Sequence, residues 1–211
     1  MLLPLALALL GAPEATAGTI VDDWARVAVP PAPALAPVTL DPRRTALLML
    51  DFNGHEDAAS GPCNAATKPR CLASLPAARR LLDLARARAR GVFVVHSTSA
   101  AGTPADIRAE VAPQPGEPVV KAGPDKFIGT DLWALVGQRN LDTLVVVGTA
   151  AEGAVLDTAT DAALHGYAVV VPVDGMSSTE PYAEQYVAWH LVHAPGLAQK
   201  SRLTRIDAIG F

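Results

Sequence analysis

The sequence predicts an α/β fold: a three-layer α-β-α sandwich built on a mostly parallel sheet. Short continuous apolar runs have the length of buried strands, and they fall at residues 45–50, 92–96, 145–147 and 168–173. Segments with helical spacing of apolar residues lie between most of them, as crossovers between parallel strands require. A length of 211 residues suits one such domain.

The stretch from residue 144 to residue 175 carries the strongest signal. A β-branched run stops at Gly148, a turn of small residues follows at 149–153, helical spacing runs from Val155, and a second apolar run ends the unit. Parallel sheets bind ligands beyond the carboxyl ends of their strands, and the following helix presents free N–H groups there. The turn at residues 148–154 is therefore the predicted active site.

The remaining elements follow in order along the chain. The run at residues 45–50 predicts a buried strand with Asp51 at its carboxyl tip. The later segments predict a helix at 75–90 ended by Gly91, a strand at 92–96, no firm element at 97–118, a short helix at 130–139, a helix at 179–193 and a last edge strand at 203–206.

The first residues suggest three regions. Residues 1–17 form a candidate signal peptide, because an apolar stretch precedes an Ala-Thr-Ala cleavage pattern, although no Lys or Arg comes before it. Residues 18–40 form a Pro/Ala-rich extended arm, and residues 41–211 form the folded domain. Export to the periplasm or medium is expected, with a cytoplasmic location as the alternative.

Composition limits the partners. A net charge of −4 argues against nucleic acid, and no later apolar run has the length of a membrane span, so no membrane contact is expected after processing. Cys63 and Cys71 lie in one polar loop and are candidates for a disulfide if the chain is exported. Two cysteines without a second pair do not make a zinc site.

Three motifs in order, TALLMLDFN, KAGPDKFIGTDL and VVVGTAAEGAVLDTATDAALHGYAVVVPVDG, resemble the isochorismatase-like hydrolases, a superfamily that includes nicotinamidases and N-carbamoyl amidases. The resemblance implies a triad of Asp, Lys and Cys, which map onto Asp51, Lys121 and the position of Ala154. A methyl group cannot attack a carbonyl, so amidase chemistry through a thioester is excluded for this sequence as written.

The resemblance also implies a site built from backbone groups. The oxyanion hole would use the amides of Ala150 and Ala154, after a cis peptide bond between Thr149 and Ala150. Backbone donors do not depend on the lost side chain, so the turn can still bind an anion or a polarised carbonyl.

Four further side chains are candidate substrate contacts: Asn53, His96, Phe127 and Glu152. Three of them have a structural alternative, namely a hydrogen bond in the core for His96, core packing for Phe127 and a helix cap for Glu152. His96 lacks the Asp-x-His pattern of metal-binding relatives, and His55 is the other candidate ligand in this half, so neither a metal nor a cofactor is expected.

Three functions remain open. The first is a hydrolase that works without cysteine, with Asp51 as general acid/base and Lys121 and the turn amides stabilising charge on a small-molecule substrate; vinyl-ether cleavage, a reaction of the isochorismatase branch, needs an acid and no thiolate. The second is a Cys-to-Ala variant of an amidase or nicotinamidase-like enzyme. The third is a non-catalytic exported protein that binds a small ligand. The resemblance also implies a homo-oligomer.

Overall fold

The computed structural model describes residues 18–54, 61–87 and 91–211, so the candidate signal peptide lies outside the described residues. The chain forms two units, residues 1–31 and residues 32–211. In the first unit, α1 (Ile20–Asp23) is followed by a 3₁₀ turn (Trp24–Arg26), and neither buries a residue. The second unit contains the sheet and the remaining helices.

The sheet of the second unit is parallel throughout its described pairings. Its strands run in the order β4-β3-β2-β5-β6-β8, and β7 pairs with β5. The bounds are β2 (Thr45–Leu50), β3 (Phe93–Ser99), β4 (Val119–Ala122), β5 (Thr143–Thr149), β6 (Ala168–Pro172), β7 (Met176–Ser177) and β8 (Ser201–Thr204). A separate parallel pair joins β1 (Val38–Thr39) to β9 (Ile209–Gly210).

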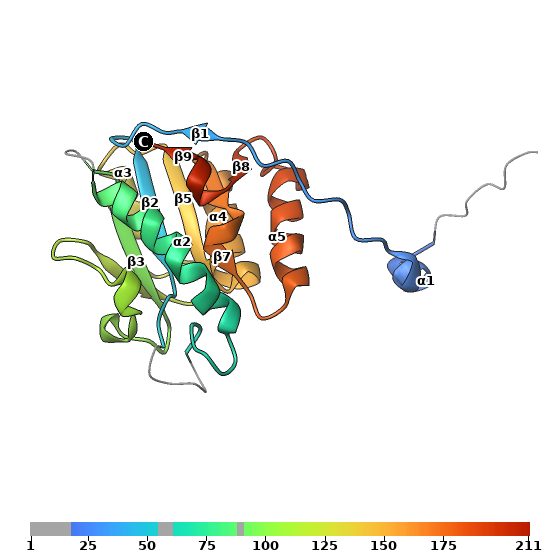
Figure 1. The fold of residues 1–211 in the computed structure, drawn as a ribbon. Coiled ribbons are helices and arrows are strands. Elements are labelled where there is room, and N and C mark those ends of the chain that lie inside the picture. Colours follow the sequence, from blue (N-terminus) through green and yellow to red (C-terminus); the bar gives the residue numbers. More distant parts are fainter. Residues whose placement is uncertain (1–17, 55–60, 88–90) are drawn as a thin grey trace, which may run out of the picture. The chain divides into compact units, whose positions relative to one another are not determined.

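Helices cover both faces of the sheet (Figure 1). Every residue of β2 is buried, and alternate side chains enter different cores. Leu47 and Met49 pack in one core with α2 (Pro69–Arg86), while Leu48 and Leu50 pack in the other. The second core also contains side chains of α3 (Leu132–Gly137), α4 (Leu156–Leu164) and α5 (Pro181–His193). The predicted three-layer sandwich is confirmed.

Several boundaries differ from the prediction. Helix α2 begins at Pro69 instead of residue 75, because a proline fits the first helical position and Cys71 already packs in the core. The last strand of the large sheet spans residues 201–204 instead of 203–206. The end of the predicted helix at 88–90 lies outside the described residues. None of the helices within the described ranges is both long and apolar enough to cross a membrane.

Candidate active site

Asp51 lies at the carboxyl tip of β2, as predicted, and only 5% of its surface is exposed. Its backbone has a φ of 55°, which turns the chain out of the strand. The Ser97 hydroxyl of β3 donates to Oδ1 at 2.7 Å, and the Asp51 amide donates to Ser97 Oγ at 3.2 Å. The neighbouring strand therefore holds the carboxylate in one orientation.

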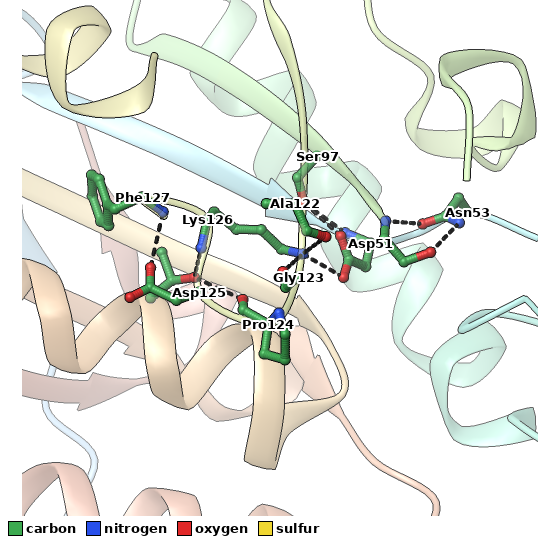
Figure 2. A network of polar contacts seen from close by, with 11 residues as sticks. Asp51, Asn53, Ser97, Ala122, Gly123, Pro124, Asp125, Lys126 and Phe127 are labelled. Atoms are coloured by element: carbon green, nitrogen blue, oxygen red, sulfur yellow. Dashed lines mark hydrogen bonds and ion pairs between the residues drawn. The ribbon is translucent and has the colours of Figure 1, made fainter. Parts of the chain in front are cut away.

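Lys126 completes a buried ion pair with this carboxylate (Figure 2). Its Nζ lies 2.7 Å from Oδ2 of Asp51, and it also donates to the Gly123 carbonyl at 2.6 Å. The side chain is 0% exposed. The lysine comes from the loop between β4 and α3, and this loop folds back over the carboxyl edge of the sheet.

Lys121, onto which the resemblance maps the triad lysine, is not the lysine that pairs with Asp51. Lys121 lies within β4, where Val120 and Ala122 point into the protein and the lysine side chain is exposed. Alternation along a strand turns residue 121 away from the face that its two neighbours occupy. Lys126 is in the same KAGPDKF motif but follows the strand, which is where a side chain can reach over the sheet edge.

Burial raises the pKa of Asp51, whereas the charge of Lys126 and the hydrogen bonds from Lys126 and Ser97 lower it; the pKa remains above the ordinary value. A carboxyl group with a raised pKa and a cation beside it can give up a proton and is then stabilised as the carboxylate. This arrangement suits general acid/base work.

The turn after β5 adopts the backbone that the resemblance implied, because the peptide bond between Thr149 and Ala150 is cis. The Thr149 hydroxyl donates to the Ser177 carbonyl of β7 at 3.2 Å. Residues Ala151–Val155 then form a π-helical turn that leads directly into α4. Single π-helical turns occur often at functional sites.

Ala154 lies in this π-helical turn and is 3% exposed. Its methyl group belongs to the same core as Ala151 and Phe127. At the start of the turn, Gly148 has a φ of 148°, and a Cβ built on it would lie 2.2 Å from the Leu50 carbonyl oxygen. The close approach of β5 to β2 at this point therefore requires glycine.

Two contacts bring the turn and the ion pair to one edge of the sheet. Leu50 pairs with Gly148 across β2 and β5, so Asp51 and Thr149 leave adjacent strands side by side. Thr158, one helical turn beyond Ala154, accepts a hydrogen bond from the Lys126 amide at 3.1 Å. Ser97, Lys126 and Thr158 were not singled out from the sequence; they became identifiable only when the fold paired these segments.

Asn53 is 2% exposed, and its amide bonds to Ser99. Figure 2 shows Asn53 on the other side of Asp51 from Lys126. Its Oδ1 accepts from the Ser99 amide at 3.3 Å and its Nδ2 donates to the Ser99 hydroxyl at 3.3 Å. Asn53 therefore fixes β3 beside the carboxylate. Glu152 is exposed on the first part of the π-helical turn.

His96 does not face Asp51, which corrects its assignment as a substrate contact. It precedes Ser97 on β3, and alternation points the two side chains in opposite directions. Its Nε2 lies 2.9 Å from Oε2 of Glu117, and the ring is 1% exposed. Phe127 is buried and stacks on Trp133 with ring centroids 3.8 Å apart, which matches the core-packing alternative.

Within the described ranges, no group of three or more His, Cys, Asp or Glu side chains is placed to hold a metal ion. His55, the second histidine considered from the sequence, lies outside the described residues.

The predicted disulfide is confirmed between Cys63 and Cys71, with Cα atoms 5.3 Å apart. Both sulfurs are buried in the core under α2. The Cys63 amide donates to the Asn53 carbonyl at 3.0 Å, so the disulfide ties the first turn of α2 to the segment that follows Asp51.

Known proteins resemble this chain in sequence and in fold. Streptothricin hydrolase of Streptomyces noursei is 37% identical over 116 residues, which are 48% of this chain and 42% of that protein. The chain thus spans less than half the length of that relative. An isochorismatase family protein of Desulfovibrio vulgaris has a similar structure with a TM-score of 0.66 at 26% identity, covering 79% of this chain and 96% of that one.

The N-carbamoylsarcosine amidase of Thermoplasma acidophilum shares the fold with a TM-score of 0.63 at 20% identity, covering 78% of this chain and 97% of that one. A model of the isochorismatase domain matches residues 45–199, which include β2, the Lys126 loop and the π-helical turn. The match covers well over half of the chain, and the chain therefore belongs to the isochorismatase domain family.

Proposed function

We propose that this chain is an isochorismatase-like hydrolase that acts on a small molecule without a cysteine nucleophile. One observation carries the proposal: a buried carboxyl group, Asp51, lies 2.7 Å from a buried ammonium group, Lys126, at the sheet edge where the π-helical turn begins. The resemblance maps the family cysteine onto Ala154 of this turn, and on that mapping the chain has an acid/base pair without a nucleophile. Such a pair suits reactions that begin with proton transfer.

Hydrolysis of a vinyl ether is a reaction of this kind. Asp51 in its acid form gives a proton to the alkene carbon, and the ether carbon becomes an oxocarbenium ion. Water adds to that carbon and returns a proton to the Asp51 carboxylate. The hemiketal then breaks into a ketone and an alcohol.

Each described group has a role in this scheme. The raised pKa of Asp51 keeps the acid form accessible, and the Lys126 ammonium stabilises the carboxylate that remains after proton transfer. Ser97 orients the carboxyl group through Oδ1. The backbone amides of Ala150 and Ala154, after the cis peptide bond, are the proposed donors to a carboxylate or oxyanion of the substrate.

The test is an assay on isochorismate and on a panel of amides with three variants. Asp51→Asn keeps the shape of the side chain and removes the acid, so kcat/KM should fall by about 100-fold or more. Lys126→Met should also lower kcat/KM, and Lys121→Met is the matched control because that lysine is exposed on β4. Equal rates for the wild type and Asp51→Asn would refute the proposal.

A second candidate is a cysteine hydrolase in which alanine has replaced the nucleophile. It is supported by the Asp51–Lys126 pair, which supplies the other two members of the triad that the resemblance implies. Ala154→Cys should then gain amidase activity, and the gain should disappear in Ala154→Cys/Lys126→Met. If neither variant gains amidase activity, this second candidate is contradicted. A ligand that binds tightly and is never turned over would instead support the third function, non-catalytic binding.

We also propose export, supported by the Cys63–Cys71 disulfide, because disulfides form and persist mainly in oxidising compartments. The amino-terminal sequence of the protein secreted or released from the periplasm should begin at Gly18 if residues 1–17 are removed. Recovery of the chain with its first residues intact in the cytoplasm would contradict this. The expected homo-oligomer stays a prediction, which light scattering on the purified chain can measure.

A further inference from the structure

A cavity lies at the amino end of the sheet, away from the Asp51 edge. Apart from Arg86 of α2, its lining residues come from segments just before or at the start of β2, β3, β4 and β5, whereas Asp51 follows the carboxyl end of β2. The cavity has a volume of about 590 Å³. The side chains that matter here are Arg43, Arg86, Phe93, Gln114, Glu117 and Arg139.

Arg139 presents an uncompensated positive charge to this cavity. Its guanidinium lies 3.8 Å from the centre of the Phe93 ring, and Nη1 donates to the Leu135 carbonyl at 3.1 Å. Across the part of the chain that the structure describes, no carboxylate lies within ion-pair distance of it. The ring and the helix end thus hold the guanidinium in place and leave donors available for a ligand.

Arg86 forms a more rigid part of the wall. Its Nε and Nη2 donate to the two Glu117 oxygens at 2.8 and 2.7 Å, and Nη2 also donates to the Ala112 carbonyl at 2.9 Å. Glu117 accepts further bonds from the Gln114 amide and from His96. The Glu117 carboxylate thus already bonds to several protein groups, and we do not expect it to bind an added cation.

Charge in the lining is positive in excess. Among the described lining residues there are three guanidinium groups and one carboxylate, and the charge of that carboxylate, Glu117, is balanced by Arg86. Arg43 has an ion pair with Asp41 at 3.3 Å, but its side chain is 66% exposed and such pairs exchange readily with solvent. A cavity of this charge in a chain of net charge −4 concentrates anions locally.

We propose that this cavity binds a small multivalent oxyanion, with Arg139 as its main contact and Arg43 as the second. Guanidinium groups match phosphate and carboxylate groups with two parallel hydrogen bonds, so either group can serve as the anionic end of the ligand. The volume falls within the range of small-molecule sites, which exceeds what one oxyanion needs and leaves room for the body of an organic phosphate or polycarboxylate. The proposal does not depend on the reaction at Asp51.

Isothermal titration calorimetry on the full chain at low ionic strength tests the proposal, with inorganic phosphate and citrate as separate probes. Saturable binding with a dissociation constant below about 1 mM is expected for at least one probe. The tighter probe identifies the anionic group, phosphate or carboxylate. Arg139→Gln should weaken binding by about tenfold or more, and Arg43→Gln should weaken it less.

Arg205→Gln is the matched control, since Arg205 is an exposed arginine with its own carboxylate partner and does not line the cavity. Its affinity should equal that of the wild type. Arg139→Lys keeps the charge and loses the planar fork, so it should bind more weakly than the wild type even if Arg139→Gln is unstable. The proposal is overturned if neither probe saturates below about 1 mM, or if the Arg139 and Arg205 variants bind equally well.

Discussion

Lys126→Met should destabilise the fold in a way that depends on pH. The substitution keeps the apolar stem and removes the ammonium group that lies 2.7 Å from Asp51. Without that charge, burial is the main influence left on the carboxyl group, and it raises the pKa further. The native state of the variant should therefore hold Asp51 in its neutral form up to a higher pH than the wild type does.

The loss in free energy of unfolding is set by the proton that Asp51 must bind when the variant folds. The ordinary pKa of this carboxyl group is 3.8, and each pH unit above it costs about 1.4 kcal/mol, which gives an upper limit of about 4 kcal/mol at pH 7 and about 1.6 kcal/mol at pH 5. The wild-type group already carries part of this cost because its own pKa is raised. We expect a loss of about 2–4 kcal/mol at pH 7, consistent with the cost of breaking a buried ion pair.

Urea unfolding at pH 7 and pH 5 measures this loss. Lys121→Met makes the same chemical change at an exposed position and should stay within about 0.5 kcal/mol of the wild type at both pH values. Asp51→Asn/Lys126→Met should recover part of the stability at pH 7, because the amide carries no charge and takes up no proton on folding. A Lys126→Met loss below about 1 kcal/mol, or one equally large at both pH values, would refute the reasoning.

Three other changes test parts of the fold. Removing the disulfide as Cys63→Ala/Cys71→Ala should cost about 2.5 kcal/mol by chain entropy for a sequence separation of eight, and reducing agent should then have no further effect on urea unfolding. The pKa of Glu117, which burial would raise, is lowered to about 2 by hydrogen bonds from Arg86, Gln114 and His96. The stability that this group contributes is complete above pH 4.5 and is lost as the pH falls through about 2. Glu117→Gln should therefore flatten the acid side of a plot of unfolding free energy against pH. Gly148→Ala should cost about 3 kcal/mol or more, because its Cβ would strike the Leu50 carbonyl, whereas Gly137→Ala, with open space around it, should change thermal unfolding little.

The sequence predicted elements that have strong local signals. The strand at residues 45–50 has the predicted bounds, and α4 follows its turn as expected, because a continuous apolar run and helical spacing are both properties of neighbouring residues. Strands β1, β7 and β9 have two residues each and exist because a distant partner pairs with them. No pattern within such a pair distinguishes it from a loop.

The candidate site was predicted in part for the same reason. Asp51 and the turn at residues 148–154 were placed at the sheet edge from their positions after apolar runs. Lys121 was assigned and Lys126 was not considered, because the lysine that reaches Asp51 is decided by where β4 ends and by how its loop returns, and neither follows from the sequence motif. His96 was misassigned because one residue along a strand reverses the direction of the side chain.

The enclosed Asp51–Lys126 contact constrains how this protein can change. Loss of either member alone leaves a charge with no solvent and no counterpart, whereas replacing both at once by apolar residues of similar volume can leave stability unchanged. Both residues must therefore be substituted together if the buried ion pair is to be replaced without a loss of stability. Ala154 carries no charge, so a substitution by another uncharged residue at this position leaves the Asp51–Lys126 pair balanced.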